Sequence, residues 1–232
     1  MIEGQDIRDN INQNEPSSFK LISALGIAGL FSGVVLVGTF IYTNPMIIAN
    51  KEAATQRAIF NVLPGCESFT TFILEEDKLQ ELSSDAEEGE GKANTLKVYA
   101  GYNNANELIG FAIPGSEPGF QDIIGAMFGY DGINKVVIGF EVLESKETPG
   151  LGDKIFKDQA FQTNFTKLSV EPEIIAVKNG EKSKANEIEA ITGATISSKA
   201  VVRLINNTLL NWKTSIDTYI IENDLKIVDK DE

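Results

Sequence analysis

Residues 189–198 read EAITGATISS, a hydroxyl-rich turn with one glycine that leads directly into a strongly periodic segment. That segment, from Ser198 to Trp212, places its apolar residues on one face of a helix, and they are Val201, Val202, Ile205, Leu209 and Trp212. A helix start presents free N–H groups and the positive end of the helix dipole, which favour a bound anion. We therefore expect a helix that begins near Ser198, with the hydroxyl of Thr195 at the mouth of a site that suits phosphate.

Helix capping is the simpler interpretation of the same hydroxyl groups. Threonine and serine are both good N-cap residues, and they stand at positions 192, 195, 197 and 198. Spacing alone favours capping over a ligand site. Gly193 lets the backbone approach a ligand closely and Ala194 adds no bulk, so the residues by themselves allow a phosphate site without requiring one.

Composition narrows the classes of function. The 34 acidic residues against 20 basic ones give a formal net charge of −14, which argues against binding to nucleic acid. The absence of histidine excludes histidine-dependent triads and histidine metal sites. The single cysteine, Cys66, supplies too few thiolates for an ordinary iron–sulfur cluster. We therefore expect no metal site and no acid–base catalytic set, and any redox function would need an organic cofactor.

Near the N-terminus, the run from Leu21 to Tyr42 contains no charged residue. As a helix it is long enough to cross the core of a bilayer. A cleaved signal peptide is the alternative, but its leading segment should be net positive, and here four acidic residues outweigh Arg8 and Lys20. We therefore expect a retained single-pass anchor. Its flanking basic residues are balanced and do not orient it.

The region between the anchor and the turn mixes strand and helix patterns. Segments rich in β-branched and aromatic residues predict strands at 95–102, 107–113, 133–143 and 174–178. Residues 154–167 are expected to be helical, with core-facing residues Ile155, Phe156, Phe161 and Phe165. Charge-rich or proline- and glycine-rich composition predicts loops at 75–92 and 114–120.

These patterns predict one transmembrane helix followed by a single α+β domain. The expected parts are a tail at 1–18, the transmembrane helix at 19–43, a juxtamembrane helix at 44–65, the α+β domain at 66–215 and a C-terminal tail at 216–232.

A second unusual segment, residues 147–155, reads ETPGLGDKI. Pro149 stiffens the turn, while Gly150 and Gly152 clear space for a planar ring beside the backbone. An ordinary turn between a strand and a helix explains the same residues equally well.

Two segments together resemble the FMN-binding domain family. The run TGAT at 192–195, with acidic Glu189 three positions before it, resembles the flavinylation motif of that family, and ETPGLGDKI resembles a second family segment in the right order. Glu189 stands where the family more often has aspartate, and Thr192 where serine is common, so the acidic group and the hydroxyl are both kept. In the family, a flavin transferase that uses FAD as donor joins FMN to the last threonine through a phosphoester.

The resemblance implies FMN covalently bound through its phosphate to Thr195. It places four further residues at the phosphate end: Thr192, Gly193, Ala194 and Ser198. It places another four beside the ring: Thr148, Gly150, Leu151 and Gly152.

The resemblance is closest to the G subunits of Rnf-type ion-translocating electron transport complexes. It implies an electron-transfer subunit without a substrate of its own, whose partners are the other subunits and the flavin transferase. It also implies a soluble domain on the outer face of the cytoplasmic membrane and a cytoplasmic tail. The C subunit of the sodium-translocating NADH:quinone reductase is the first alternative, and a flavin-less scaffold subunit is the second. A free-standing flavoenzyme is disfavoured because the sequence offers no acid–base set.

Overall fold

The computed structural model describes residues 17–76, 78–82 and 96–225. Most of the predicted tail at 1–18, much of the predicted acidic loop and the last seven residues lie outside these ranges. The chain divides into two compact units, residues 1–52 and 53–232.

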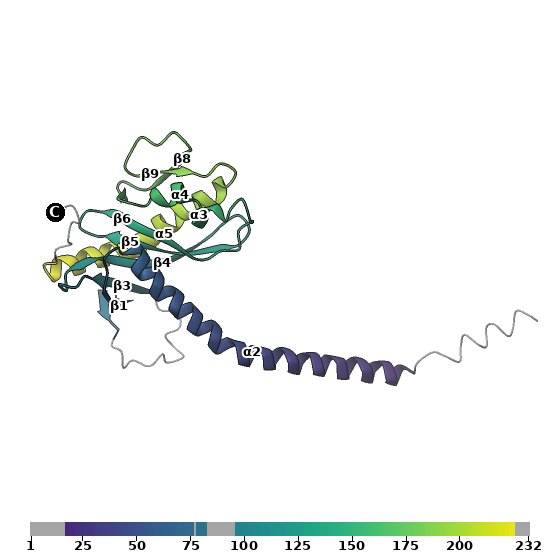
Figure 1. Cartoon of the computed structure of the whole chain (residues 1–232). Helices are drawn as coiled ribbons and strands as arrows, with labels where there is room; N and C mark the ends of the chain where they lie inside the picture. The colour runs from purple at the N-terminus through teal and green to yellow at the C-terminus, as the bar shows by residue number, and fades with distance from the viewer. Residues whose placement is uncertain (1–16, 77, 83–95, 226–232) are drawn as a thin grey trace, which may run out of the picture. The chain divides into compact units, whose positions relative to one another are not determined.

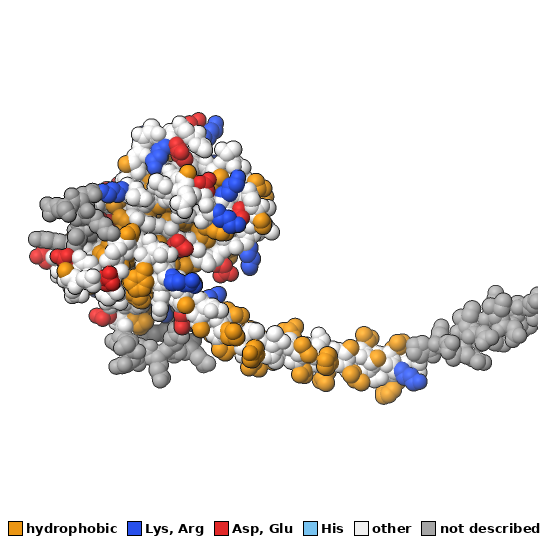
Figure 2. Space-filling view, viewed as in Figure 1, with side chains coloured by type: hydrophobic (Ala, Val, Ile, Leu, Met, Phe, Trp, Pro, Cys, Tyr) orange, Lys and Arg blue, Asp and Glu red, His pale blue; other side chains and the backbone are white. Residues whose placement is uncertain are grey.

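One long helix, α2 (Ser18–Val62), begins the described chain. Its apolar side chains are exposed along the part that belongs to the first unit, as Figure 2 shows. Among the described residues this is one helix long and apolar enough to cross a membrane, which fits a single-pass anchor. The helix continues through Pro45, so the predicted boundary between residues 43 and 44 does not interrupt it.

An antiparallel sheet of seven strands forms the core of the second unit, in the spatial order β2-β1-β3-β4-β5-β6-β7 (Figure 1). The strands are β1 (Ser68–Glu75), β2 (Lys78–Glu81), β3 (Lys97–Tyr102), β4 (Leu108–Pro118), β5 (Ile123–Asp131), β6 (Val136–Glu144) and β7 (Leu168–Ser169). Helix α5 (Thr195–Glu222) packs on one face, where Trp212 and Ile205 are fully buried among strand residues such as Phe128. This arrangement confirms the predicted α+β class.

The last turns of α2 pack against the opposite face of the sheet. Ile59, Val62 and Leu63 are fully buried there. Gly129 and Gly139, which pair across β5 and β6, make room for them: a Cβ on Gly139 would lie 2.5 Å from the carbonyl oxygen of Val62, and one on Gly129 would lie closer still. Glycine therefore lets the helix backbone approach the strands directly.

A smaller two-stranded parallel sheet adjoins the main one. It consists of β8 (Ile175–Lys178) and β9 (Glu187–Ala190), and it lies near two short helices, α3 (Lys154–Lys157) and α4 (Gln159–Thr163), in Figure 1. The buried Ile188 of β9 and Phe161 of α4 belong to the core beneath α5. Strand β9 is the element that leads into the EAITGATISS turn.

Several strand and loop predictions were wrong. Strand β1 occupies residues for which no element was predicted, β2 lies within the predicted loop at 75–92, and β4 continues through Pro114 into the predicted loop at 114–120. Pro114 pairs with Met127 of β5, while the pairing of β4 with β3 ends at Ala112, so the proline lies where β4 has a partner strand on one side alone.

The helix predictions also need correction. The segment 154–167 contains two short helices, and Phe156 is 42% exposed although it was expected in the core. Helix α5 begins at Thr195, three residues before the predicted start, and extends past residue 215. Because Ile216 and Ile220 are buried against the sheet, the predicted C-terminal tail is in part core helix.

Candidate functional site

The turn between β9 and α5 presents an uncapped helix N-terminus. Gly193 has φ +85°, a conformation that favours glycine, and the N–H of Ala194 donates to the carbonyl of Ile191 at 3.0 Å. Ala194 is the N-cap and makes no side-chain capping hydrogen bond. Thr195 is therefore the first helical residue, and its side chain is exposed.

The two buried serines of the turn serve other purposes than capping. The hydroxyl of Ser198 accepts from the N–H of Ile191 at 3.1 Å and donates to the carbonyl of Ala194 at 3.0 Å. The hydroxyl of Ser197 donates to the Glu147 carboxylate at 2.5 Å. Since neither serine binds the N–H groups of the first turn, capping is not the role of these side chains. The N–H groups at the start of α5 therefore remain able to bind an anion.

A cavity of about 300 Å³ opens beside Thr195, and we name it the Thr195 cavity. Three separate segments line it: Phe120 after β4, the loop after β6, and the first turn of α5. The lining residues are Phe120, Glu147, Thr148, Leu151, Gly152, Gly193, Ala194, Thr195, Ile196 and Ser197. Its volume is at the lower end of the range for ligand pockets.

The structure brings six of the nine predicted site residues to this cavity. They are Thr148, Leu151, Gly152, Gly193, Ala194 and Thr195. Gly150 belongs to the same loop but does not line the cavity, and Ser198 is fully buried behind the turn. Thr192 lines a different cavity.

The loop after β6 has a fixed conformation. Gly150 has φ +79°, and its N–H donates to the Asp153 carboxylate at 2.8 Å. Lys157 pairs with the other oxygen of Asp153 at 2.6 Å. The hydrogen bond from Lys157 holds the pKa of Asp153 below its usual value, so this carboxylate stays ionised as it closes the turn. The side chain of Leu151 is left half exposed at the cavity.

Glu147 is a buried carboxylate in the cavity wall, only 5% exposed. One of its oxygens accepts from the main-chain N–H groups of Phe120 at 2.8 Å and Gln121 at 2.9 Å. Burial by itself raises the pKa of Glu147, but the hydrogen bonds from Ser197 and from main-chain N–H groups outweigh burial and leave the pKa below its ordinary value.

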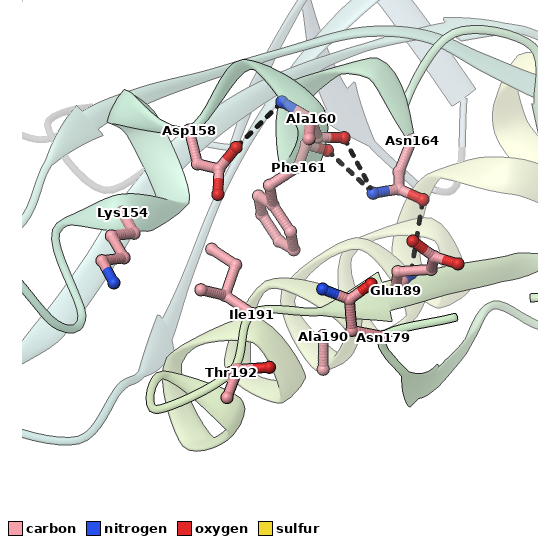
Figure 3. Close-up of a pocket in the computed structure, with 10 residues that line it drawn as sticks. All are labelled: Lys154, Asp158, Ala160, Phe161, Asn164, Asn179, Glu189, Ala190, Ile191 and Thr192. Atoms are coloured by element: carbon pink, nitrogen blue, oxygen red, sulfur yellow. Dashed lines mark hydrogen bonds between the residues drawn. The ribbon is translucent and has the colours of Figure 1, made fainter. Parts of the chain in front are cut away.

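A second cavity, of about 220 Å³, lies on the other side of the turn and is shown in Figure 3; we name it the Glu189 cavity. Asn164 is its central polar group. The amide oxygen of Asn164 accepts from the N–H of Glu189 at 3.3 Å, and its amide nitrogen donates to the carbonyl of Phe161 at 3.1 Å (Figure 3). These bonds join β9 to the end of α4. The motif residues Glu189 and Thr192 thus face away from the Thr195 cavity.

Four lining residues were not predicted as site residues: Phe120, Glu147, Ile196 and Ser197. Glu147 begins the ETPGLG segment and Ser197 lies in the hydroxyl-rich turn, so both were within the segments that the sequence marks. Phe120 offers no signal in the sequence, because its place depends on how β4 connects to β5. Within the described ranges no group of three or more acidic or cysteine side chains could hold a metal ion.

Comparisons with known proteins agree with this geometry. The FMN-binding domain family matches residues 119–210, a range that includes every residue of the Thr195 cavity. The G subunit of the Na(+)-translocating ferredoxin:NAD(+) oxidoreductase complex of Acetobacterium woodii is 37% identical over 48% of this chain and 52% of its own length. The G subunit of the proton-translocating ferredoxin:NAD(+) oxidoreductase complex of Clostridium ljungdahlii is 27% identical over 83% of this chain and 90% of its own length.

The fold has a solved counterpart. The crystal structure of Shewanella oneidensis NqrC aligns with a TM-score of 0.58 at 15% identity, over 76% of this chain and 99% of that one. At that identity the likeness concerns the fold alone. Together these matches agree with the predicted resemblance: residues 119–210 match the FMN-binding domain family, and the chain is similar in sequence to the G subunits of ion-translocating oxidoreductase complexes.

Proposed function

We propose that this chain holds FMN in the Thr195 cavity through a phosphoester to Thr195, and that it is the electron-transfer subunit of a membrane-bound ion-translocating ferredoxin:NAD(+) oxidoreductase. One observation carries the proposal. An exposed threonine is the first residue of a helix without a side-chain cap, and it opens onto a cavity that the ETPGLG loop also lines.

The residues present fit the phosphate end of FMN. The first-turn N–H groups of α5 have no side-chain cap, and the helix dipole adds about 0.3–1 kcal/mol in favour of an anion at that place. The lack of a side chain at Gly193 and the small side chain of Ala194 leave room for the phosphate oxygens. Thr192 and Ser198 would support the turn from outside the cavity.

The other side of the cavity fits a planar aromatic ring. Phe120, Leu151 and Ile196 present apolar surface around it, and each of these side chains is about half exposed or more. Gly152 adds no side chain there, Gly150 permits the turn that precedes it, and Thr148 contributes a hydroxyl. When bound, FMN supplies the ability to take up and release one or two electrons, and the residues of the chain hold and orient it.

The proposal includes partners and a place in the cell. A flavin transferase would attach the cofactor, and the other subunits of the complex would exchange electrons with it and move the ion. The soluble domain would lie on the outer side of the cytoplasmic membrane, where covalent attachment prevents loss of the cofactor. The equivalent subunit of a sodium-translocating NADH:quinone reductase is the second candidate that the sequence resemblance implies.

Attached flavin can be tested directly. The full chain is expressed with a flavin transferase, separated on a denaturing gel and viewed under ultraviolet light, and its mass is measured. We expect a fluorescent band and the added mass of one FMN phosphoester. Thr195→Val, which keeps the shape and removes the hydroxyl, should abolish both, while Thr192→Val should only weaken them because Thr192 lines the other cavity.

A dark wild-type band would favour the flavin-less scaffold and overturn the proposal. Flavin retained by Thr195→Val would move the attachment point. Thr192 would then be the first candidate, since Ser197 and Ser198 are 2% and 0% exposed.

A further inference from the structure

Glu147 is a charged group enclosed by hydrogen-bond donors from two other segments. Its first oxygen binds the N–H groups of Phe120 and Gln121, and its second binds the hydroxyl of Ser197. It forms no ion pair with a lysine or arginine of the described ranges. Dipoles alone therefore stabilise its charge, and the net negative charge remains at the wall of the Thr195 cavity.

Two glycines, Gly119 and Gly152, leave the space that this carboxylate occupies. A Cβ on Gly119 would lie 2.5 Å from the first Glu147 oxygen. A Cβ on Gly152 would lie 2.8 Å from the Glu147 Cβ and 2.9 Å from the Ser197 hydroxyl. Any side chain at either position would displace the carboxylate, so the site is built around it.

The segments that Glu147 joins are the segments that form the cavity. Its hydrogen bonds tie the chain after β4 and the first turn of α5 to the loop after β6. Phe120, whose side chain is 66% exposed, is thereby held at the cavity that Thr195 also lines. Removing the carboxylate would leave the N–H groups of Phe120 and Gln121 without their acceptor, so these two segments would no longer be joined.

We propose that Glu147 is the positioning residue of the Thr195 cavity: it ties the main chain at Phe120 to the first turn of α5 and places a permanent negative charge beside the cofactor, which lowers the cofactor's midpoint potential. The inference rests on the proposed function, because it concerns FMN in that cavity. Reduction adds electrons to the cofactor, and a nearby anion disfavours added negative charge, more strongly where water is excluded. The depressed pKa of Glu147 agrees with a carboxylate that is ionised at neutral pH.

Glu147→Gln separates charge from shape. The glutamine oxygen can accept from both main-chain N–H groups, and its amide nitrogen can donate to the Ser197 hydroxyl, which rotates to accept. Glu144→Gln is the matched control, because it removes the same charge from an exposed residue at the end of β6 that does not line the cavity.

The measurement is a redox titration of flavin absorbance on the full chain, matured with a flavin transferase and purified in detergent. We expect Glu147→Gln to keep attached FMN and to raise its midpoint potential by at least a tenfold change in the reduction equilibrium, about 30 mV for a two-electron couple. Glu144→Gln should match the wild type. Equal potentials in Glu147→Gln and the wild type would overturn the inference.

Ser197→Ala provides the second variant. It keeps the carboxylate charge and removes one donor that stabilises it, so we expect a midpoint potential lower than that of the wild type, opposite in sign to Glu147→Gln. If Glu147→Gln retains no flavin, the positioning role of Glu147 is supported. The midpoint potential of Ser197→Ala then tests the electrostatic role of Glu147, and a potential equal to that of the wild type would refute that role. A wild-type chain without FMN would overturn the proposed function, and this inference with it.

Discussion

Gly129→Ala tests whether the close approach of α2 to the sheet is what requires glycine in β5. A Cβ at this position would lie 3.0 Å from the carbonyl carbon of Val62 and still closer to its oxygen. Both atoms are backbone, so they cannot move aside as the end of a flexible side chain can. Overpacking of this kind typically costs about 1–3 kcal/mol.

The substitution also has a favourable component. Replacing glycine by alanine restricts the unfolded chain and stabilises a compatible site by about 0.4–1 kcal/mol. The net loss for Gly129→Ala is therefore expected to be about 1.3 kcal/mol, the difference between the midpoints of these two ranges. Gly125→Ala in the same strand is the matched control, since its nearest neighbours would lie 3.7 Å or more from the new Cβ. That variant should be neutral or slightly stabilised.

Urea unfolding of the full chain in detergent provides the assay. The chain has one tryptophan, Trp212, which is 1% exposed in the core beneath α5, so its fluorescence reports the folded domain. Gly129→Ala should unfold at lower urea than the wild type, and Gly125→Ala should not. A midpoint for Gly129→Ala equal to or above that of Gly125→Ala would refute the idea that backbone contact with Val62 excludes a side chain.

Two further predictions concern the turn and its surroundings. Gly193→Ala should reduce the fraction of chains with attached flavin severalfold. Gly180→Ala is the control, because Gly180 has a similar φ of +81° and open space around it, so the substitution should cost comparable backbone strain without reducing that fraction. Equal fractions of flavin-bearing chain by mass measurement in the two variants would refute the prediction. The pKa of Glu187 in the folded chain is lowered, and the largest cause is the hydrogen bond from the main-chain N–H of Ser183. Glu187 therefore stabilises the fold at pH values above its pKa in the unfolded chain, near 4.5, and this stabilisation is lost as the pH falls through the lower folded pKa. Glu187→Gln should therefore show a shallower loss of stability below pH 4.5 in acid titrations followed by tryptophan fluorescence, and an unchanged pH profile would contradict this.

Local sequence pattern predicted the elements whose environment is uniform along their length. The apolar run of α2 and the buried face of α5 both repeat over several turns, so composition and period were sufficient. Strand β1 was missed although it begins with Ser68 and Phe69 in a plausible pattern, because its pairing with β3 joins residues about thirty positions apart. The end of α5 was misplaced because polar residues follow Trp212 on its outer face, while Ile216 and Ile220 continue the buried one.

The candidate site was predictable where it is made from consecutive residues. Both of the segments that the sequence marks contribute to one cavity, and Gly152 and Gly193, where a side chain is missing, both line it. Phe120 was not predictable, because its place depends on the connection from β4 to β5 and on the hydrogen bond that its N–H makes to Glu147, 27 residues away. Long-range contacts of single residues leave no period in the sequence.

The turn itself explains why a motif cannot assign roles to its members one by one. A chain that reverses direction exposes successive residues on opposite sides, so Glu189 and Thr192 line one cavity while Gly193 and Thr195 line the other. With FMN in the Thr195 cavity, as proposed, residues on the Glu189 side would act on it by holding β9 in place, as the Asn164 bond to the N–H of Glu189 does. Residues on the Thr195 side would contact the proposed FMN directly. A substitution on the first side should therefore change how much cofactor is attached, and only one on the second side should change how the attached cofactor behaves.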